Sequence, residues 1–353
     1  MLKLSEANAR GLCTESLTGR GLPPEQARSC TDAIMFASLR GLDSHGIISI
    51  LPGICNSIAA GRIDAQGAIQ TIRPNVLKGN GAAGPVIGEA TMRRAMEDAV
   101  RRGVGVAVAF NCNHFGAASY YAAMALSQNM VGLCMCNAGP SVAPFGGSKP
   151  LHGTNPIAYA VPGGVEAPIV LDIATSVAAH GQVHKAVRRG QPIPVGWAVD
   201  AEGRPTTDAA AAMKGTLLPF GAHKGYGLGV LVDLLTAGLA ASTVGTEVRQ
   251  GDVDREHAGQ SFFMLAIDPA FLGGTDALKD RTDSIWRQVR SIPPAEGFKE
   301  VLVPGELEHR EEARRRRDGI PLYDEDWTAI VQGLARAGLP AEDLAAKYAP
   351  AAT

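Results

Sequence analysis

Hydrophobic and polar positions alternate with a helical period over the first hundred residues of the chain. Ser5 is a suitable N-cap for a first short helix, and Pro23-Pro24-Glu25 opens a second helix that Gly41 ends. A third helix is expected over residues 88–102, with small apolar residues inward and arginines outward. The apolar positions of the second helix share one face: Ala27, Cys30, Ile34 and Ala37.

From Val104 onward, short β-type runs alternate with helical segments and are separated by Gly, Pro and Asn. This alternation predicts a layered α/β unit over residues 104–286, with residues 1–103 and 287–353 forming a second, discontinuous helical domain. The expected strands cover 104–110, 131–136, 156–161, 169–173 and 261–267. The expected later helices cover 117–128, 224–241, 306–318 and 324–337, the last two after a turn at Pro304-Gly305-Glu306.

Length and charge narrow the classes of function. A chain of 353 residues suggests about two domains. With 33 basic and 35 acidic residues, the net charge of −2 gives no electrostatic footprint for a nucleic acid. The one basic run, Arg314–Arg317, follows Glu311 and Glu312 at helical spacing, so it predicts a solvated, ion-paired helix face.

Cysteine usage and hydropathy bear on the compartment. The six cysteines have no framework spacing, and Cys134 and Cys136 would be neighbours on one strand face, which favours buried thiols. The first residues lack the apolar segment of a signal peptide, and the longest apolar stretch, 225–241, carries Asp233 and several glycines. The sequence therefore predicts a protein of the reducing cytoplasm without a membrane span.

The segment Gly79-Asn80-Gly81-Ala82-Ala83-Gly84 fits the G-x-G-x-x-G pattern of dinucleotide-binding turns. It follows a run of β character at 70–77 and precedes the third expected helix. However, no acidic residue ends a second strand at the expected distance, and Pro85 removes a backbone donor. Because a chance match is easy in a chain with 42 glycines, a Rossmann site is not favoured here.

Two histidine motifs are candidates for acid–base chemistry. Asp43-Ser44-His45-Gly46 contains the residue types of a catalytic triad, but side chains that are consecutive in sequence diverge and cannot line up. His45 could instead act as a general acid beside a hydroxyl group, or be a structural loop histidine. Asn113-His114-Phe115-Gly116 follows an expected strand, where α/β folds bind ligands, so His114 is a second candidate acid or a helix cap.

Other segments offer ligand contacts. Gly153-Thr154-Asn155-Pro156 places a hydroxyl and an amide in a turn, and Asp172–Ser176 places small polar residues after a buried strand, where a phosphate could bind. Lys224 lies at the start of an expected helix, opposes the helix dipole and therefore favours a bound anion such as pyrophosphate. His180 and His184 have the spacing of two metal ligands, but the metalloprotease pattern is incomplete and no metal site is predicted.

Taken together, these segments resemble the malate/L-lactate dehydrogenase superfamily that is unrelated to the Rossmann lactate dehydrogenases. That superfamily includes ureidoglycolate and sulfolactate dehydrogenases, diketogulonate reductase and the piperideine/pyrroline-2-carboxylate reductases. The resemblance spans nearly the whole chain and rests on the order and spacing of eight segments: Asp43–Gly46, Asn113–Gly116, Ala143–Gly147, Gly153–Ala158, Asp172–Ser176, Gly196–Ala198, Lys224–Gly227 and Pro304–Glu306.

The resemblance implies a homodimer with a non-Rossmann layered α/β fold, in which NAD or NADP lies against a mixed, largely antiparallel sheet beside a discontinuous helical domain. It implies an oxidoreductase that reduces a small 2-oxo acid or oxidises the 2-hydroxy acid. A cyclic or N-alkyl 2-imino acid is the alternative substrate. The sequence shows no secure ribose-selecting residue, so NAD and NADP both stay open.

The resemblance also implies residue roles. His45 is the expected proton donor with Ser44 behind it, although members of the superfamily differ on whether this histidine or the one at His114 is the acid. Ser49, Thr154, His180 and Gly181 are expected to contact the substrate. The residues expected to line the cofactor site are His114, Phe115, Gly116, Asp172, Ala174, Thr175, Ser176, Lys224, Gly225, Pro304, Gly305 and Glu306.

Two positions depart from the superfamily pattern. Ser49 stands where many relatives carry an arginine that holds the substrate carboxylate, so the usual 2-keto acid substrates are in doubt. Gln182 stands where imine-reducing members have an acidic residue, so a relay to the catalytic histidine would be weaker. Two other classes stay open: a non-catalytic nicotinamide-binding dimer and a metal hydrolase that uses His180 and His184.

Overall fold

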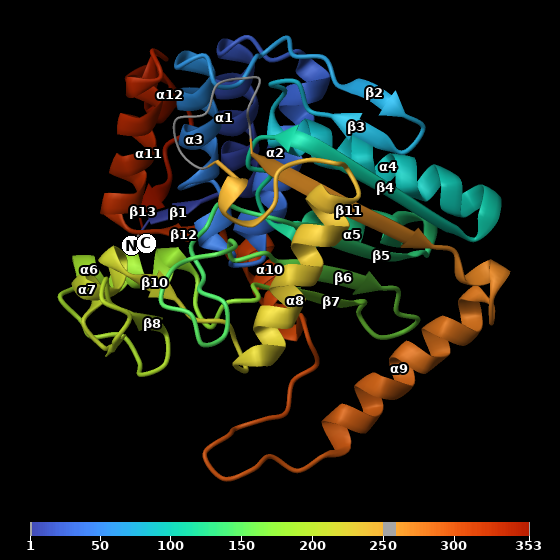
Figure 1. The fold of residues 1–353 in the computed structure, drawn as a ribbon. Coiled ribbons are helices and arrows are strands. Elements are labelled where there is room, and N and C mark those ends of the chain that lie inside the picture. The colour runs from blue at the N-terminus through green and yellow to red at the C-terminus, as the bar shows by residue number, and fades with distance from the viewer. Residues whose placement is uncertain (1, 250–258, 353) are drawn as a thin grey trace.

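The computed structural model describes residues 2–249 and 259–352 (Figure 1). The two ends of the chain lie side by side, because strand β1 (Leu2–Leu4) pairs with both β12 (Ile320–Leu322) and β13 (Ala351–Ala352) in a small antiparallel sheet. The last described residues of the chain therefore lie beside the first ones.

A helical cluster draws on both ends of the sequence. Its helices are α1 (Glu6–Gly19), α2 (Pro24–Leu39), α3 (Ile50–Ala59), α11 (Asp324–Arg336) and α12 (Ala341–Lys347). One hydrophobic core joins them, with Leu17, Ile34, Leu51 and Leu334 almost fully buried. This core has the discontinuous composition expected from sequence, although the division at residues 103 and 287 stays a prediction.

A seven-stranded sheet forms the centre of the described part of the chain, in the order β2-β3-β4-β11-β5-β6-β7. Only β3 and β4 run parallel, and the other neighbours pair antiparallel. The mixed, largely antiparallel sheet of the non-Rossmann α/β class is therefore confirmed. The strands are β2 (Gln70–Arg73), β3 (Val76–Lys78), β4 (Val104–Cys112), β5 (Val131–Cys136), β6 (Ile157–Val161), β7 (Ile169–Ile173) and β11 (Gln260–Ile267).

Helices cover the two faces of this sheet unequally. One face is covered by α4 (Gly84–Arg102) and α5 (Ala118–Met124), which bury a core rich in small residues and methionine. The other face carries α8 (His223–Asp233), which continues as a π-turn over Leu234–Gly238. A smaller unit contains α6 (His180–Arg188), α7 (Ala209–Lys214) and three short strands: β8 (Ala198–Val199), β9 (Pro205–Thr206) and β10 (Thr216–Leu217).

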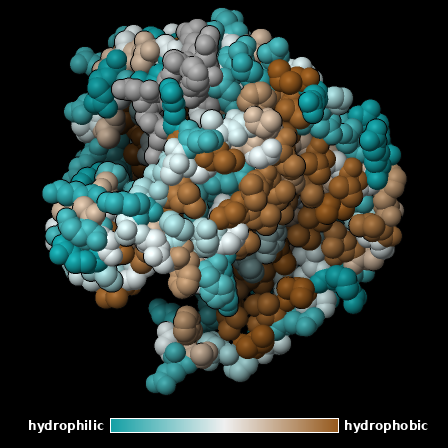
Figure 2. All heavy atoms as spheres, in the orientation of Figure 1, coloured by the Kyte–Doolittle hydropathy of each residue, from teal (hydrophilic) through white to brown (hydrophobic). Residues whose placement is uncertain are grey.

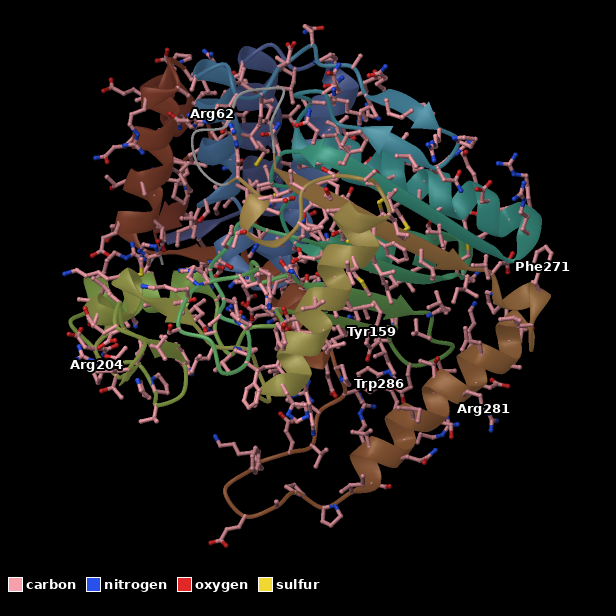
Figure 3. All side chains as sticks on the ribbon, viewed as in Figure 1. Arg62, Tyr159, Arg204, Phe271, Arg281 and Trp286 are labelled. Atoms are coloured by element: carbon pink, nitrogen blue, oxygen red, sulfur yellow. The ribbon has the colours of Figure 1, made fainter. Side chains whose placement is uncertain are left out.

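Helix α9 (Thr275–Ser291) extends away from the body of the molecule before the chain returns to α10 (Glu306–Asp318) (Figure 1). Its inner face is anchored to the turn between β6 and β7. Trp286 Nε1 donates a hydrogen bond to Ala167 O at 2.8 Å, and the Trp286 side chain packs in one cluster with Tyr159 of β6 (Figure 3). Asp283 accepts backbone N–H groups of Gly164, Val165 and Glu166.

Several expected elements differ from the structure. Helices α3 and α9 were not expected. Pro52 is compatible with α3 because it falls in the first turn, where a missing N–H costs little. The helix expected from residue 88 begins at Gly84, because Pro85 is well suited to a first turn. The single strand expected at 70–77 is a hairpin, β2 and β3, and the helix expected over 224–241 ends as an α-helix at Asp233.

The described residues bear on two further expectations. All six cysteines are free and buried. Burial raises the pKa of each of these thiols. Among the described helices, none is long and apolar enough to cross a membrane.

Candidate active site

The catalytic candidate His45 lies on a short 3-10 turn, Asp43–His45, between α2 and α3. Ser44 Oγ lies 2.9 Å from His45 Nδ1, so the hydroxyl orients the ring and leaves Nε2 free. The His45 side chain is half-buried. Burial lowers the pKa of His45, and the nearby Asp172 carboxylate opposes this shift without cancelling it.

His114 lies in the loop after β4 and meets His45 in space. The two rings stack with their centroids 5.5 Å apart and their planes 23° apart. His114 Nδ1 accepts the backbone N–H of Gly116 at 3.2 Å, which leaves Nε2 as the protonated nitrogen of the neutral ring. His114 keeps exposed surface. The protein packed around its ring, and the nearby His45, lower the pKa of His114 to about 4.

Close backbone packing brings the His114 loop into place. A Cβ at Gly84 would collide with the carbonyl oxygen of His114, and one at Gly79 would lie 2.5 Å from that of Asn111. These two glycines belong to the G-x-G-x-x-G segment, which lies between β3 and α4. Their absence of side chains is thus explained by the approach of that segment to the end of β4.

Asp172 on β7 is the charged group beside the histidine pair. Its Oδ2 accepts both the backbone N–H and the hydroxyl of Ser119 at the start of α5, at 2.8 and 2.7 Å. Burial raises the pKa of Asp172, while the Ser119 hydrogen bonds and the charge of His45 act in the opposite direction. Three elements, β7, α5 and the His45 turn, therefore meet at this carboxylate.

The segments expected to hold substrate and cofactor are joined by hydrogen bonds of their own. The backbone N–H and hydroxyl of Thr175 donate to Thr154 O at 2.8 and 3.0 Å, and Ser176 Oγ donates to Ala178 O. Both hydroxyls are therefore used within the protein. Any phosphate contact in this segment would have to come from other groups, such as the backbone at Ala174.

The start of α8 lies against the same segment. Gly225 has no room for a side chain, because a Cβ would contact the carbonyl oxygens of Phe220 and Thr175. Ala222, the residue before the helix, has φ 58° and ψ −119°, a strained conformation for a residue with a side chain. Lys224 is exposed and has no ion pair with any described residue.

The turn at 304–306 packs on β7. Gly305 has φ 83°, and a Cβ there would collide with Val170 O. Glu306 is buried and accepts hydrogen bonds from Val303 N and from Arg310, at 3.1 and 2.7 Å. The Glu306 carboxylate therefore already has hydrogen-bond partners within the protein. Pro304 is the exposed residue of the turn.

The remaining expected substrate residues have looser surroundings. His180 begins α6, and Gly181 beside it faces open space. Burial and the nearby His184 lower the pKa of His180. Ser49 precedes α3 and is exposed, as is Gln182. No group of three or more His, Cys, Asp or Glu among the described residues could hold a metal ion.

Two features were missed at the level of sequence. Arg315, from the arginine run, is buried rather than solvated, and its guanidinium binds Asp43 of the His45 turn. The expected pairing of the run is otherwise confirmed by Arg315 with Glu311 and Arg316 with Glu312. Sequence offered no signal for the Asp43 contact, because the partners are 272 residues apart.

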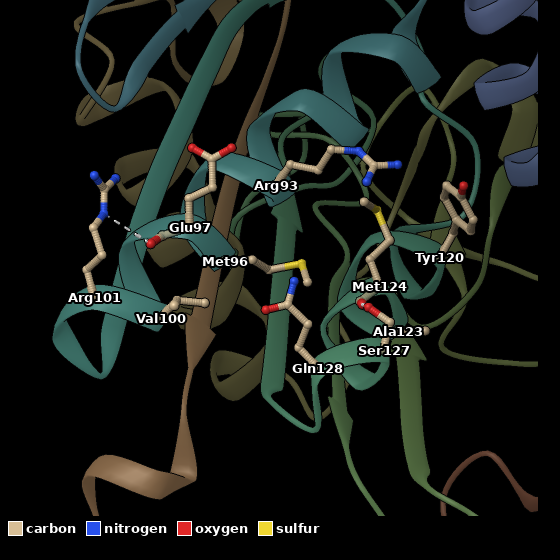
Figure 4. Close-up of a pocket in the computed structure, with 10 residues that line it drawn as sticks. All are labelled: Arg93, Met96, Glu97, Val100, Arg101, Tyr120, Ala123, Met124, Ser127 and Gln128. Carbon is tan, nitrogen blue, oxygen red and sulfur yellow. Dashed lines mark hydrogen bonds between the residues drawn. The ribbon is translucent and has the colours of Figure 1, made fainter.

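The second feature is a pocket away from the histidines. It has a volume of about 640 Å³ and lies between α4 and the α5 region (Figure 4). Its lining combines Met96, Val100 and Met124 with charged residues such as Arg93 and Glu97. None of the expected site residues lines it, so this pocket is separate from the histidine pair.

The arrangement around the histidines fits a flat, anionic cofactor. Side chains at Gly116 and Gly181 would meet nothing within 4 Å, so open space adjoins both histidine segments. Lys224 supplies an unpaired cation at the entry to α8, as phosphates require. The segments at 114–116, 172–176 and 224–225 thus offer imidazole, backbone N–H and ammonium groups, which are donors that suit an anionic nucleotide cofactor.

Comparison with known proteins identifies the family of the chain. Residues 4–331 match the family described as malate/L-lactate dehydrogenase. The L-sulfolactate dehydrogenase of Methanocaldococcus jannaschii is 36% identical over 344 residues, covering 96% of this chain and 98% of that protein. The solved structure of the M. jannaschii enzyme superimposes with a TM-score of 0.88 over 97% of this chain and 99% of that one.

Two further relatives have different printed activities. Ureidoglycolate dehydrogenase (NAD(+)) of Escherichia coli K12 is 32% identical over 339 residues, covering 94% of this chain and 95% of that protein. The solved structure of delta1-piperideine-2-carboxylate reductase from Pseudomonas syringae pvar. tomato has 29% identity and a TM-score of 0.79, over 94% of this chain and 100% of that one. The chain thus belongs to the malate/L-lactate dehydrogenase family of oxidoreductases, whose cofactor is NAD or NADP.

Proposed function

We propose that this protein reduces a small 2-oxo acid with NAD(P)H, or oxidises the corresponding 2-hydroxy acid, with His45 as the proton donor. The observation that carries the proposal is the stacked pair of His45 and His114, in which each ring has one nitrogen committed and Nε2 free. The sulfolactate, malate and ureidoglycolate dehydrogenases among its relatives support a 2-hydroxy acid chemistry.

The two histidines have different roles in this proposal. A bound NAD(P)H would supply the hydride for the substrate carbon, and Nε2 of protonated His45 would supply the proton for the developing alkoxide. The carbonyl double bond is thereby converted to C–H and O–H. As the His45 ring gains its second proton, Nδ1–H can donate to Ser44 Oγ, so one hydroxyl supports both protonation states.

His114 would stay neutral throughout. Its pKa of about 4 and the fixed Gly116 contact keep a proton on Nε2 and none on Nδ1 at pH 7. A neutral imidazole N–H can polarise the substrate oxygen without adding a second cation beside His45. We therefore assign His45 as the acid and His114 as the hydrogen-bond donor to the reacting oxygen.

The substrate carboxylate needs another anchor, because Ser49 replaces the arginine usual at its position. A serine hydroxyl gives one hydrogen bond and no charge, in contrast to the bidentate contact of a guanidinium. Thr154 and the first turn of α6 at His180 and Gly181 are the proposed additional contacts. This weaker clamp predicts a higher KM for simple 2-oxo acids than an arginine site would give.

Reduction of a cyclic 2-imino acid is the second candidate. It is favoured by the structural similarity to delta1-piperideine-2-carboxylate reductase, in which the reacting group named is an imine. Against it, Gln182 cannot stabilise an imidazolium as a carboxylate would. Asp172, which already acts on His45 through its charge, is the carboxylate available here instead.

The proposal is tested by a substrate panel. Pyruvate, oxaloacetate and 3-sulfopyruvate are compared with Δ1-piperideine-2-carboxylate and Δ1-pyrroline-2-carboxylate, each with NADH and with NADPH, by following nicotinamide absorbance. Turnover of any oxo acid that is lost in His45→Asn supports the main proposal. Nicotinamide binding without turnover across the panel would instead support a non-catalytic binding dimer.

We also propose that the protein forms a homodimer in a reducing compartment such as the cytoplasm. Leu231 on α8, Leu234 in its π-turn and Leu239 directly after that turn are 41%, 55% and 56% exposed. Figure 2 shows an extended hydrophobic area in this region of the molecule. Sedimentation equilibrium of the wild type and of Leu234→Glu tests the dimer; a monomeric wild type would contradict it. The buried thiols support the reducing compartment.

A further inference from the structure

Arg315, which is distant in sequence, binds the turn that carries His45. Arg315 Nη1 and Nη2 donate to the two carboxylate oxygens of Asp43 at 2.6 and 3.2 Å. Asp43 directly precedes Ser44 and His45, so this contact fixes the start of the turn. Asp43 is therefore engaged by an arginine and takes no part in a relay with its neighbours.

The guanidinium of Arg315 is almost fully committed. Nη1 also donates to Ser38 O at 2.7 Å, and Nε donates to Glu311 Oε1 at 2.5 Å. Four of its five N–H donors have thus a named acceptor, and the side chain is only 6% exposed. A buried cation with this donor geometry has one orientation, whereas a lysine ammonium could not span both oxygens of Asp43 and the Ser38 carbonyl.

Ser38 binds the other end of the turn. Its hydroxyl accepts the backbone N–H of Ile47 at 2.9 Å and donates to Ile34 O at 2.8 Å. Gly46 packs against it so closely that a Cβ would lie 2.7 Å from Ser38 Oγ. The residues on both sides of Ser44 and His45 are therefore held by α2 and Arg315 together.

Arg315 belongs to α10, which begins at the proposed cofactor turn. Gly305 is its N-cap, and Arg315 lies nine residues after Glu306 on the same helix. At 1.5 Å per residue this is about 14 Å of continuous helix. A single rigid element thus contacts β7 at Val170 with one end and the catalytic turn with the other.

We propose that Arg315 is a positioning residue that holds Ser44 and His45 in their catalytic orientation and connects them, through α10, to the cofactor turn at 304–306. This inference rests on the proposed function of His45 as proton donor. Arg315 contacts no reacting atom in this scheme. Its effect passes through Asp43 and the Ser38 carbonyl.

The arginine run supplies a matched control. Arg317 lies two residues further along the same helix, is 71% exposed and pairs with the adjacent Asp318. Arg317→Met removes the same charge and side chain as Arg315→Met without touching the catalytic turn. Any effect of net charge or of helix propensity should therefore be shared by the two variants.

The first measurement is single-turnover hydride transfer per cofactor-binding site, with the active oxo or imino acid of the panel. Arg315→Met should lower the rate about 100-fold, because misplacement of a catalytic group by about 1 Å has an effect of that order. The rate of Arg315→Lys should lie between those of Arg315→Met and the wild type, and the rate of Arg317→Met should equal that of the wild type. Dissociation constants for NADH and NADPH, measured by fluorescence, should change less than threefold in each variant.

The second measurement needs no substrate. The His45 imidazole is titrated by NMR in histidine-labelled protein and assigned by difference from His45→Asn. The charged or titratable groups that act on it are Asp172 and His114, and the Asp43–Arg315 pair lies at the start of its turn. Arg315→Met should raise the pKa of His45, because it leaves the Asp43 carboxylate unpaired; Asp43→Asn should lower it, because the guanidinium is then unpaired; and the double variant should lie between.

The outcomes separate the two proposals. If His45→Asn transfers hydride at the wild-type rate, the proposed function fails whatever Arg315 does. If His45→Asn is inactive while Arg315→Met matches Arg317→Met in both rate and His45 titration, the positioning role is overturned and the proposed function stands. If Arg315→Met does not fold, Arg315→Lys and Asp43→Asn decide, and wild-type behaviour of both would overturn the positioning role.

Discussion

The two histidine segments of the site solve the same problem of orientation in different ways. The His114 segment follows a buried strand, and its ring is fixed by a backbone N–H, a donor that cannot reverse its role. The His45 segment is a turn between two helices, and its ring is fixed by the Ser44 hydroxyl, which can donate or accept. A rigid donor fixes one protonation state, whereas a hydroxyl supports two.

This difference assigns the chemistry within an otherwise symmetrical pair. Stacked rings with centroids 5.5 Å apart disfavour two simultaneous positive charges. The Asp172 carboxylate offsets part of the pKa decrease that burial causes at His45. No carboxylate raises the pKa of His114 in the same way. The ring that can be charged is therefore His45. The following predictions test this contrast, from the largest effect to the smallest.

Replacing His45 by Asn should have the largest effect. Removal of a general acid typically lowers the rate about 10²–10⁴-fold, and we expect a loss in this range for hydride transfer. Cofactor affinity should be kept, because Asn retains a polar group of similar reach. Stopped-flow single-turnover rates and NAD(P)H fluorescence titrations provide the two readouts, and an unchanged rate would exclude His45 as the acid.

Replacing His114 by Asn should have a smaller effect of a different kind. The loss of one hydrogen bond to a developing alkoxide corresponds to roughly 1.5–3 kcal/mol, or about 10–100-fold in rate. The ionisation that governs the rate should persist, because it belongs to His45. A variant that loses both rate and pH dependence would show that the two roles have been assigned the wrong way round.

Replacing Asp172 by Asn should shift the pH profile rather than remove activity. The Asp172 carboxylate raises the pKa of His45, so its neutralisation lowers that pKa further. The rate of reduction then begins to rise only at more acidic pH. Profiles of kcat/KM between pH 5 and 8 measure this; a shift toward alkaline pH would contradict the sign.

Replacing Ser44 by Ala should have the smallest effect. The variant loses one hydrogen bond to His45 Nδ1, worth roughly 0.5–1.5 kcal/mol, which corresponds to about 2–10-fold in rate. Ser44→Thr keeps the hydroxyl and serves as the matched control. A loss as large as that in His45→Asn would mean that Ser44 itself takes part in proton transfer.

Local sequence patterns predicted the elements of the site better than their connections. The strand before His114, the strand that carries Asp172 and the start of α8 were expected from hydrophobic runs and their flanking glycines. Helix α9 was not expected, although Leu278, Trp286 and Val289 recur at helical spacing along its sequence. The signal for this helix was therefore present in the sequence, but its anchoring by Trp286 and Asp283 to the turn between β6 and β7 depends on tertiary contacts.

Asp43 and Arg315 show the limit most clearly. The position of Asp43 beside Ser44 and His45 indicated a triad, which chain geometry excluded, but nothing local indicated its partner. Arg315 is one of four consecutive arginines, and sequence periodicity does not tell which of them is buried. Only the folded path of α10 past the catalytic turn selects it.

The most direct test of the central claim is the pH dependence of single-turnover reduction in the two histidine variants, measured with one substrate and saturating cofactor. We predict that His114→Asn keeps an ionisation below pH 6.5, with the rate rising as pH falls, and that His45→Asn shows a flat profile over the same range. The account would be contradicted by the reverse, an ionisation that persists in His45→Asn and disappears in His114→Asn.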